Sequence, residues 1–203
     1  WPLAYGARYV EAFDADDRSV EAARKNLSKF QNVSIHKGDI KTYSTSSGRQ
    51  FDLVMSIGVI HHLNDPKAAL ENLARLVRPG GKLLIWVYGY EGNEWIVKYL
   101  NPLRKKIFSR LPVGLTHVCA YLLSIPLFVY LKLIPQQKTY LAQLKKFNFP
   151  HIHSIVFDQM LPTIANYWRK EEAVELFKDI PGVTEISINP VNGISWTCVA
   201  KVN

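Results

Sequence analysis

The fold is decided by the stretch Phe51-Asp52-Leu53-Val54-Met55-Ser56-Ile57-Gly58-Val59-Ile60-His61-His62-Leu63-Asn64-Asp65-Pro66. Its apolar run begins at Leu53 and stops at Gly58, which predicts a buried strand whose carboxyl end opens into a loop. Asn64-Asp65-Pro66 predicts a helix start, because a capping side chain precedes a proline at the first helical position. Ligands of open α/β sheets bind at the carboxyl ends of the strands, so we expect the functional site at this loop.

Two adjacent histidines, His61 and His62, follow this strand. They are candidates for the chemistry of the site, because imidazole gains and loses a proton near neutral pH. A His-His pair before a helix is more often a packed or solvated turn than a metal site. No cysteine, glutamate or third histidine accompanies the pair at ligand spacing, so no metal site is predicted.

Composition indicates one globular domain with an insertion. The chain has 203 residues, of which 48% are hydrophobic, and this is enough for a sizeable core. Cys119 and Cys198 lie far apart in apolar surroundings, which predicts neither a disulfide framework nor a thiolate metal site and favours a reducing, cytoplasmic compartment. Residues 1–8 lack an initiator methionine and a signal-peptide pattern, so we expect the chain to begin within a longer protein.

The net charge of +8 is concentrated in one segment. Residues 95–157 contain no acidic residue, whereas the rest of the chain holds sixteen basic and seventeen acidic residues. The basic residues of the segment are Lys98, Arg104, Lys105, Lys106, Arg110, Lys132, Lys138, Lys145 and Lys146. This distribution predicts an anionic partner for the segment and not for the protein as a whole.

The elements before and after the decisive stretch alternate between strands and helices. We expect strands over residues 9–13, 32–37, 51–57 and 82–88, and helices over 19–29 and 66–77, the second ended by Arg78-Pro79-Gly80-Gly81. This order predicts a doubly wound parallel sheet. Asp14 follows the first of these strands, where nucleotide-binding folds place an acid for ribose hydroxyls. Asp14, Asp16 and Asp17 would alternatively cap the following helix.

Four motifs in this order and spacing resemble the class I S-adenosylmethionine-dependent methyltransferases, in particular the type 11/12 domains. They are Asp14 after a strand, the Gly38-Asp39 pair, residues 51–63, and Leu76-Val77-Arg78-Pro79-Gly80-Gly81-Lys82-Leu83. The resemblance covers about residues 9–88. It implies a Rossmann-like doubly wound sheet, an S-adenosylmethionine cofactor and a helical insertion before the last two strands.

The resemblance also implies roles for individual residues. Asp14, beside Ala15, would bind the ribose hydroxyls, and Asp39 would bind the adenine amino group, with Gly38 and Ile40 next to it. The methionine side of the cofactor would be lined by Ser56, Ile57 and Gly58. His61 and His62 would face the substrate, and either is the candidate general base.

One feature of the family is missing. Its members carry a glycine-rich loop after their first strand, but the only glycine before Asp14 is Gly6. We therefore interpret residues 1–8 as the tail of the first helix and expect the chain to lack the first strand and its loop. In this fold that strand lies between those ending at Asp14 and Ile57, so we expect a gap in the centre of the sheet.

The segment after Tyr88 is open to several interpretations. Residues 111–131 carry no formal charge and are long enough to span a bilayer, but Pro112, Gly114 and Pro126 argue against a spanning helix. The segment could be a lid, a basic and apolar surface that lies on an anionic membrane, or an additional helical layer. As a lid, it would wall an apolar pocket with Trp95, Tyr99, Phe108, Tyr121, Phe128 and Tyr130.

These expectations divide the chain into a cofactor-binding core over residues 1–94, a lid insertion over 95–168, and a closing part over 169–203. The closing part should contain a helix over 170–178 and an antiparallel pair, residues 184–188 and 194–202, around the turn at Asn192-Gly193. His62, Tyr88, Tyr99 and Tyr167 are the substrate-facing candidates. Asp158 also lies where the lid rejoins the core.

The function predicted from these features is methyl transfer from S-adenosylmethionine to a small-molecule or lipid-like acceptor. A non-catalytic methyltransferase-like module, which binds a partner or an anionic membrane surface through residues 95–157, is the alternative. Nucleic acid is disfavoured as the substrate, because the chain lacks the Asn/Asp-Pro-Pro-aromatic signature and its basic residues accompany apolar ones. We expect a cytoplasmic protein, with contact to the membrane periphery if the insertion binds lipid.

Overall fold

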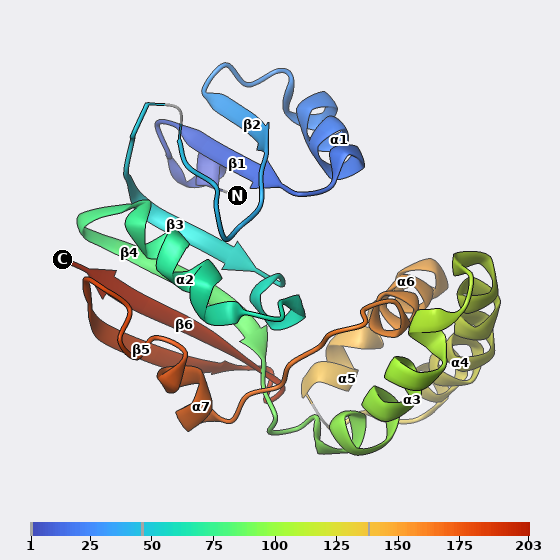
Figure 1. Cartoon of the computed structure of the whole chain (residues 1–203). Coiled ribbons are helices and arrows are strands. Elements are labelled where there is room, and N and C mark those ends of the chain that lie inside the picture. Colours follow the sequence, from blue (N-terminus) through green and yellow to red (C-terminus); the bar gives the residue numbers. More distant parts are fainter. Residues whose placement is uncertain (1, 46, 138) are drawn as a thin grey trace.

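The computed structural model describes residues 2–45, 47–137 and 139–203. Their strands form two separate sheets (Figure 1). In the smaller sheet, β1 (Val10–Asp14) pairs in parallel with β2 (Val33–Lys37), and helix α1 (Asp17–Leu27) connects them. The larger sheet has the order β3-β4-β6-β5, built from β3 (Phe51–Ile57), β4 (Val77–Tyr88), β6 (Ser195–Val202) and β5 (Val183–Val191).

The expected central gap in the sheet is observed. No described strand pairs with both β1 and β3, so the sheet is interrupted where the family places its first strand. Residues 2–8 form no regular α-helix; a 3-10 turn, η1 (Pro2–Tyr5), precedes β1. The interpretation of residues 1–8 as a helix tail stays a prediction, because a single 3-10 turn is also common at the end of an α-helix.

The core lies on one face of the larger sheet. Val54 of β3, Leu83 and Ile85 of β4 and Cys198 of β6 are buried there beneath α2 (Pro66–Arg75) and α7 (Lys170–Glu175). The opposite face of β3 is open, since Leu53, Met55 and Ile57 are exposed. Alternation along a strand sends successive side chains to opposite faces, so one face of β3 forms the core and the other has no cover.

Helix α2 begins as its sequence predicts. The Asp65 carboxylate accepts a hydrogen bond from the Ala68 amide at 3.1 Å, and Pro66 occupies the first helical position. The hairpin prediction is also confirmed, because Asn192 and Gly193 adopt φ values of 54° and 69° between β5 and β6. Helix α7 ends at Glu175, earlier than the residue 178 expected from the sequence.

The turn before β4 differs from the expectation. The strand already begins at Val77, which pairs with Phe51, and the next partners are Lys82 and Leu53. The intervening residues, 78–81, therefore bulge from the strand opposite Asp52, whose carboxylate accepts a hydrogen bond from Arg78 Nε at 2.8 Å. The glycines permit this path, since Gly80 has a φ of 77° that L-residues rarely adopt.

Replacement of Gly81 by alanine is expected to destabilise this bulge. A methyl group there would lie 2.9 Å from the Arg78 carbonyl oxygen and 3.0 Å from that of Asp52, and relief of such overlap costs about 1–3 kcal/mol. Urea denaturation would measure the lower free energy of unfolding. Gly114→Ala is the control, because nothing lies within 4 Å of the added methyl group; equal unfolding midpoints for the two variants would contradict the prediction.

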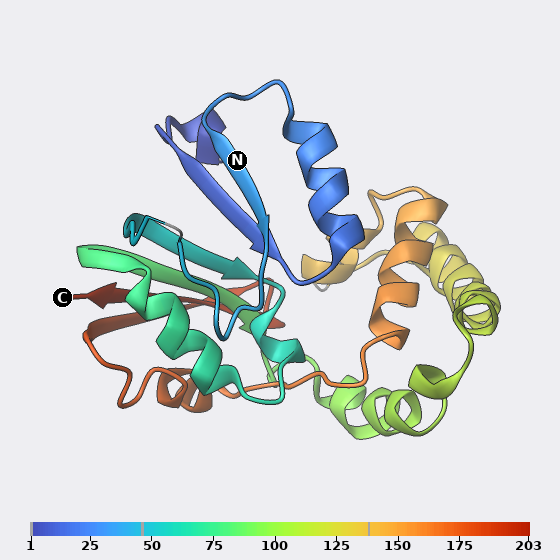
Figure 2. The same cartoon turned by 45° about the horizontal axis from the view of Figure 1, so that its top comes forward.

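The residues between β4 and α7 form a helical insertion beyond the carboxyl ends of β3 and β4 (Figure 2). It contains η3 (Ile96–Leu100), α3 (Asn101–Lys106), η4 (Phe108–Arg110), α4 (Val113–Leu133), α5 (Thr139–Leu144) and α6 (Phe149–Met160). Pro112, Gly114 and Pro126 do not interrupt α4, because Pro112 is its N-cap residue and Pro126 is accommodated inside the helix. The expected breaks are therefore absent.

Helix α4 exposes most of its apolar side chains and buries several small and polar ones. Thr116, Ala120, Ser124 and Leu131 are buried. A stripe at helical spacing lies on the exposed surface, with exposed fractions of 47% to 77%: Leu115, Val118, Leu122, Ile125, Val129 and Leu133. This pattern is the reverse of that of a helix on the surface of a water-soluble protein. Among the described residues, α4 is also the one helix long and apolar enough to cross a bilayer.

Candidate active site

The carboxyl ends of β1 and β2 bring the expected adenosine-binding residues together. Asp14 is the last residue of β1, and its carbonyl oxygen accepts a hydrogen bond from the Gly38 amide at 3.0 Å. Asp39 is exposed next to Gly38, and Ile40 packs against the core. Two carboxylates therefore lie at adjacent strand ends, where they can accept hydrogen bonds from hydroxyl or amino groups.

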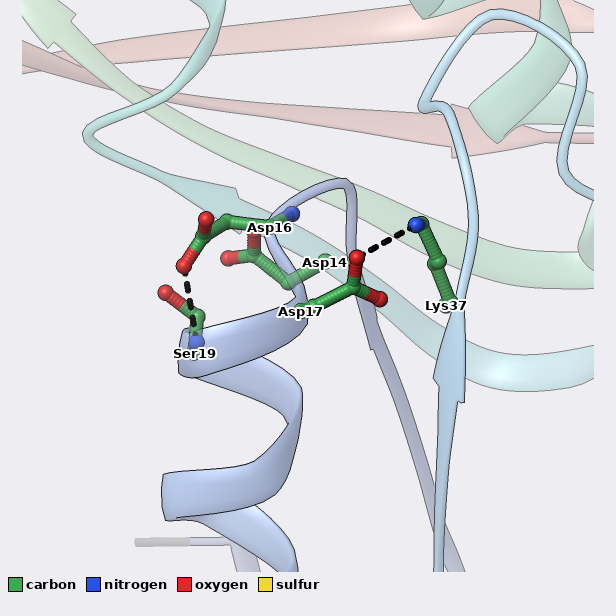
Figure 3. A network of polar contacts seen from close by, with 5 residues as sticks. All are labelled: Asp14, Asp16, Asp17, Ser19 and Lys37. Carbon is green, nitrogen blue, oxygen red and sulfur yellow. Dashed lines mark hydrogen bonds and ion pairs between the residues drawn. The ribbon is translucent and has the colours of Figure 1, made fainter.

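The three aspartates at the end of β1 and directly after it have different roles (Figure 3). Asp16 is the N-cap of α1 and accepts from the Ser19 amide at 2.8 Å, a bond that lowers the pKa of its carboxyl. Asp17 forms an ion pair with Lys37 at 2.7 Å. Asp14 accepts from the Asp16 amide at 2.9 Å but remains exposed at the sheet edge, next to Ala15. The capping interpretation thus applies to Asp16, and Asp14 stays the ribose candidate.

The end of β3 offers the other part of the expected cofactor site. Ser56 is buried, and its hydroxyl has no hydrogen-bond partner. Ile57 is 61% exposed, and Gly58 has a φ of 79° with nothing within 4 Å of the position of a β-carbon. An unpaired hydroxyl beside an open glycine fits residues that a ligand approaches closely. Ser56, Ile57 and Gly58 therefore stay the candidates for the methionine end of the cofactor, and the residues at β1 and β2 those for its adenosine end.

Four of the predicted substrate-facing residues form one cluster of stacked rings. The His61 ring stacks on Tyr88 with centroids 3.7 Å apart, and Tyr88 stacks on Tyr167 at 5.3 Å. His62 meets His61 edge-on at 4.3 Å. Tyr99 is not part of the cluster, because it is 64% exposed and Lys98 lies over its ring. Residues from the β3 loop, the end of β4 and the chain that returns from the insertion thus meet at one point.

Backbone hydrogen bonds hold the histidine loop. The His61 carbonyl accepts from the Asn166 amide at 2.8 Å, and His62 Nδ1 lies 2.7 Å from the Ile164 carbonyl oxygen. A carbonyl oxygen only accepts, so Nδ1 of His62 must carry the proton in this contact. In the neutral ring, Nε2 is then left as the proton acceptor, which is the arrangement of an oriented general base.

His61 differs from its neighbour because it is fully buried and neither ring nitrogen has a hydrogen-bond partner. Burial lowers the pKa of His61 to about 3, and the nearby His62 and Arg104 act in the same direction. His61 is therefore neutral at pH 7 and is a weak base. Of the two candidates predicted from the sequence, this geometry favours His62 as the base and His61 as a hydrogen-bonding group.

The insertion adds residues that sequence reasoning missed. Arg104 of α3 is fully buried, and its Nη2 donates to Asn101 Oδ1 at 2.5 Å. The Gln159 side chain of α6 donates to the Tyr88 hydroxyl at 2.9 Å. In the sequence, Arg104 is one of nine basic residues in the segment, and no local pattern distinguishes it from its neighbours.

The expected aromatic wall around a single pocket is not observed. Tyr121 stacks on His153 at 3.9 Å between α4 and α6, while Trp95 and Tyr130 are exposed. That prediction was wrong, because the apolar stripe of α4 points outward and not toward the sheet. Within residues 2–45, 47–137 and 139–203, no three histidine, cysteine or acidic side chains cluster so that they could hold a metal ion.

The chain is similar in sequence to known methyltransferases. Residues 2–85 match the family model described as "Methyltransferase domain". The chain is 32% identical over 77 residues, 37% of its length, to the mitochondrial ubiquinone biosynthesis O-methyltransferase of Dictyostelium discoideum. It is 25% identical over 108 residues, 48% of its length, to the ubiquinone biosynthesis O-methyltransferase of Aromatoleum aromaticum. These matches cover only 23% and 46% of the two relatives.

The fold is found in solved structures at low sequence identity. Human N-acetylserotonin methyltransferase in complex with SAM superposes with a TM-score of 0.55 at 14% identity, covering all of this chain and 43% of the other. Residues 2–85 therefore match a methyltransferase-domain model, and the whole length of the chain has the fold of solved methyltransferase structures.

Proposed function

We propose that the protein transfers a methyl group from S-adenosylmethionine to a small, lipid-like acceptor. The observation that carries this proposal is the cluster of His61, His62, Tyr88 and Tyr167 at the carboxyl ends of β3 and β4, beneath the insertion. The family match and the two acidic strand ends support the cofactor. The names of the curated relatives support an oxygen atom as the methyl acceptor.

The bound cofactor supplies an electrophilic methyl group on a sulfonium ion. When the cofactor binds, Asp14 would accept hydrogen bonds from the ribose hydroxyls, and Asp39 would accept one from the adenine amino group. Nε2 of His62 removes the proton of the acceptor hydroxyl, since Nδ1 is committed to the Ile164 carbonyl. Neutral His61 orients the acceptor oxygen, and the insertion excludes water from the reacting atoms.

We further propose that α4 lies on an anionic membrane surface and gives the site access to a lipid-like acceptor. Its exposed apolar stripe supports this proposal, together with the exposed basic residues Arg110 and Lys132 at its two ends. Apolar side chains enter the boundary between headgroups and acyl chains, while basic residues attract anionic headgroups. The protein would then act at the cytoplasmic face of a membrane.

Calorimetric titration with S-adenosylhomocysteine tests the cofactor assignment. S-adenosylhomocysteine, which is the cofactor after methyl transfer, would be titrated into two proteins. One is the chain itself, and the other is a version extended at its N-terminus by a first strand and a glycine-rich loop. We expect Asp14→Ala to weaken binding about 10- to 100-fold, since a hydrogen bond to a charged group contributes roughly 1.5–3 kcal/mol.

Asp17→Ala is the matched control, because it removes a carboxylate three residues away that pairs with Lys37 and does not belong to the proposed site. Its affinity should stay close to that of the unchanged chain. Absence of binding in both versions of the chain would contradict the proposal and favour a non-catalytic module.

A further inference from the structure

Arg104 is a charged side chain in an unusual position. It is fully buried between α3 and α6, at the edge of the ring cluster of the candidate site. Its guanidinium group is near enough to act on three of these rings: burial lowers the pKa of His61 and Arg104 adds to that shift, whereas burial raises the pKa of Tyr88 and Tyr167 and Arg104 partly offsets it. A positive charge of the insertion therefore reaches the place where the acceptor is expected.

The partners of Arg104 are neutral. Nη2 donates to Asn101 Oδ1 at 2.5 Å and Nη1 to the Gln159 carbonyl oxygen at 3.3 Å, while Nε has no partner. Within the described part of the chain, no carboxylate lies within 4.0 Å of it as an ion pair. Arginine does not lose its proton in proteins, so the buried charge remains uncompensated, which is costly.

Other unpaired groups lie beside this charge. Both ring nitrogens of His61 and the buried hydroxyl of Tyr167 make no hydrogen bond of good geometry, although Arg104 is close enough to Tyr167 to act on its pKa. Buried polar groups in proteins are normally paired with protein, water or ligand. Several unpaired groups at one point, together with an uncompensated charge, indicate a ligand that supplies acceptor oxygens and a negative charge.

We propose that Arg104 binds a carboxylate group of the methyl acceptor, so that the substrate is an organic acid with a planar acid group. This inference rests on the proposed methyl transfer and names the substrate class of the same site. The guanidinium group is a planar fork that pairs with both oxygens of a carboxylate. The ring nitrogens of His61 and the Tyr167 hydroxyl then bond to the body of the acceptor.

Binding of an acid to Arg104 requires the insertion to open and then close over the ligand. Because Arg104 is fully buried, a ligand reaches it only when α3 moves away from the edge of the sheet. The side-chain hydrogen bonds between the insertion and the core include Gln159 to Tyr88 at 2.9 Å and a reciprocal, exposed pair between Gln143 and Asn192. Binding of an acid would offset the buried charge and favour the closed position.

Nuclear magnetic resonance titration tests the proposal, with benzoate and benzamide as probes. The two molecules have nearly the same shape and differ in charge. Each would be added to the chain with and without saturating S-adenosylhomocysteine. We expect the Arg104 Nε–Hε signal to shift with benzoate and not with benzamide, and benzoate to bind at least tenfold more tightly.

Variants separate recognition of the acid from a structural role of Arg104. In Arg104→Gln, the affinities for benzoate and benzamide should lie within about twofold of each other. Arg104→Lys keeps the charge but not the planar guanidinium group, so its ratio of benzoate to benzamide affinity should be intermediate. Lys105→Gln is the control, because it removes an exposed charge from the same helix and should leave the preference unchanged. Amide spectra would show that each variant is folded.

Several results would overturn the proposal. They are equal affinity for benzoate and benzamide in the unchanged chain, an Arg104 signal that benzoate does not move, and tighter binding of inorganic phosphate than of benzoate. The signal of the unchanged chain decides the question even if Arg104→Gln does not fold. If S-adenosylhomocysteine fails to bind while benzoate moves the Arg104 signal, the methyl-transfer proposal fails and the acid site remains.

Discussion

Replacement of Leu122 and Leu133 by glutamine is expected to abolish binding of the protein to anionic vesicles. The two side chains are 70% and 77% exposed on the outward stripe of α4. Burial of a leucine side chain away from water contributes about 1.5–3 kcal/mol. With incomplete insertion, loss of both removes about 2–4 kcal/mol, which lowers the partition coefficient roughly 30- to 1000-fold. Cosedimentation with vesicles of phosphatidylcholine and phosphatidylserine would measure this change.

Val174→Gln is the control for this experiment. Val174 is an exposed apolar residue on α7, outside the insertion, so its replacement should not change vesicle binding. Binding of the unchanged chain should also fall when salt is added or phosphatidylserine is omitted, because surface charges are screened by salt. A double leucine variant that sediments with vesicles like the unchanged chain would show that α4 does not contact the membrane.

Local signals account for most of what could be predicted from the sequence. An apolar run that ends at Gly58, the Asp65-Pro66 cap and the Asn192-Gly193 turn each determine structure within a few residues, and the structure has the strand, the helix start and the turn at these places. The prediction that the strand is buried was wrong for one of its faces, where Leu53, Met55 and Ile57 are exposed. The position of His61 and His62 at a strand end followed from the same signals. The bulge at residues 78–81 was predicted as a turn, because the glycines mark the bend but not the pairing of Val77 with Phe51.

The remaining features depend on contacts between distant residues. Helix α4 is apolar on nearly every side, so its sequence contains no periodicity that shows which face packs against α6. The expected aromatic wall failed for this reason. Arg104 and Gln159 lie in different helices and meet at the end of β4, and neither has a neighbour in sequence that predicts this. Tyr167 belongs to the ring cluster and Tyr99 does not. This difference depends on the path of the chain through the insertion, which brings Tyr167 and not Tyr99 to the sheet.

His61 is expected to make the protein less stable as the pH falls below about 6.5. In the unfolded chain a histidine takes up a proton near pH 6.5, whereas burial holds the pKa of folded His61 at about 3. Between these values the unfolded state binds one more proton than the folded state. The contribution of His61 to the free energy of unfolding is thus fully present above pH 6.5. It is lost as the pH falls toward 3, by up to about 1.4 kcal/mol per pH unit.

His61→Phe isolates this contribution, because phenylalanine keeps a ring against Tyr88 and cannot take up a proton. Urea denaturation between about pH 4.5 and 6.5 would give the free energy of unfolding at each pH, and the contribution of the carboxyl groups is common to both proteins. We expect the free energy of unfolding of His61→Phe to depend less on pH than that of the unchanged chain, so that the two curves diverge by about 1 kcal/mol per pH unit. Since His153 also has a lowered pKa from burial, the difference between the curves reports His61, and parallel curves would show that His61 is protonated in the folded protein or is not buried.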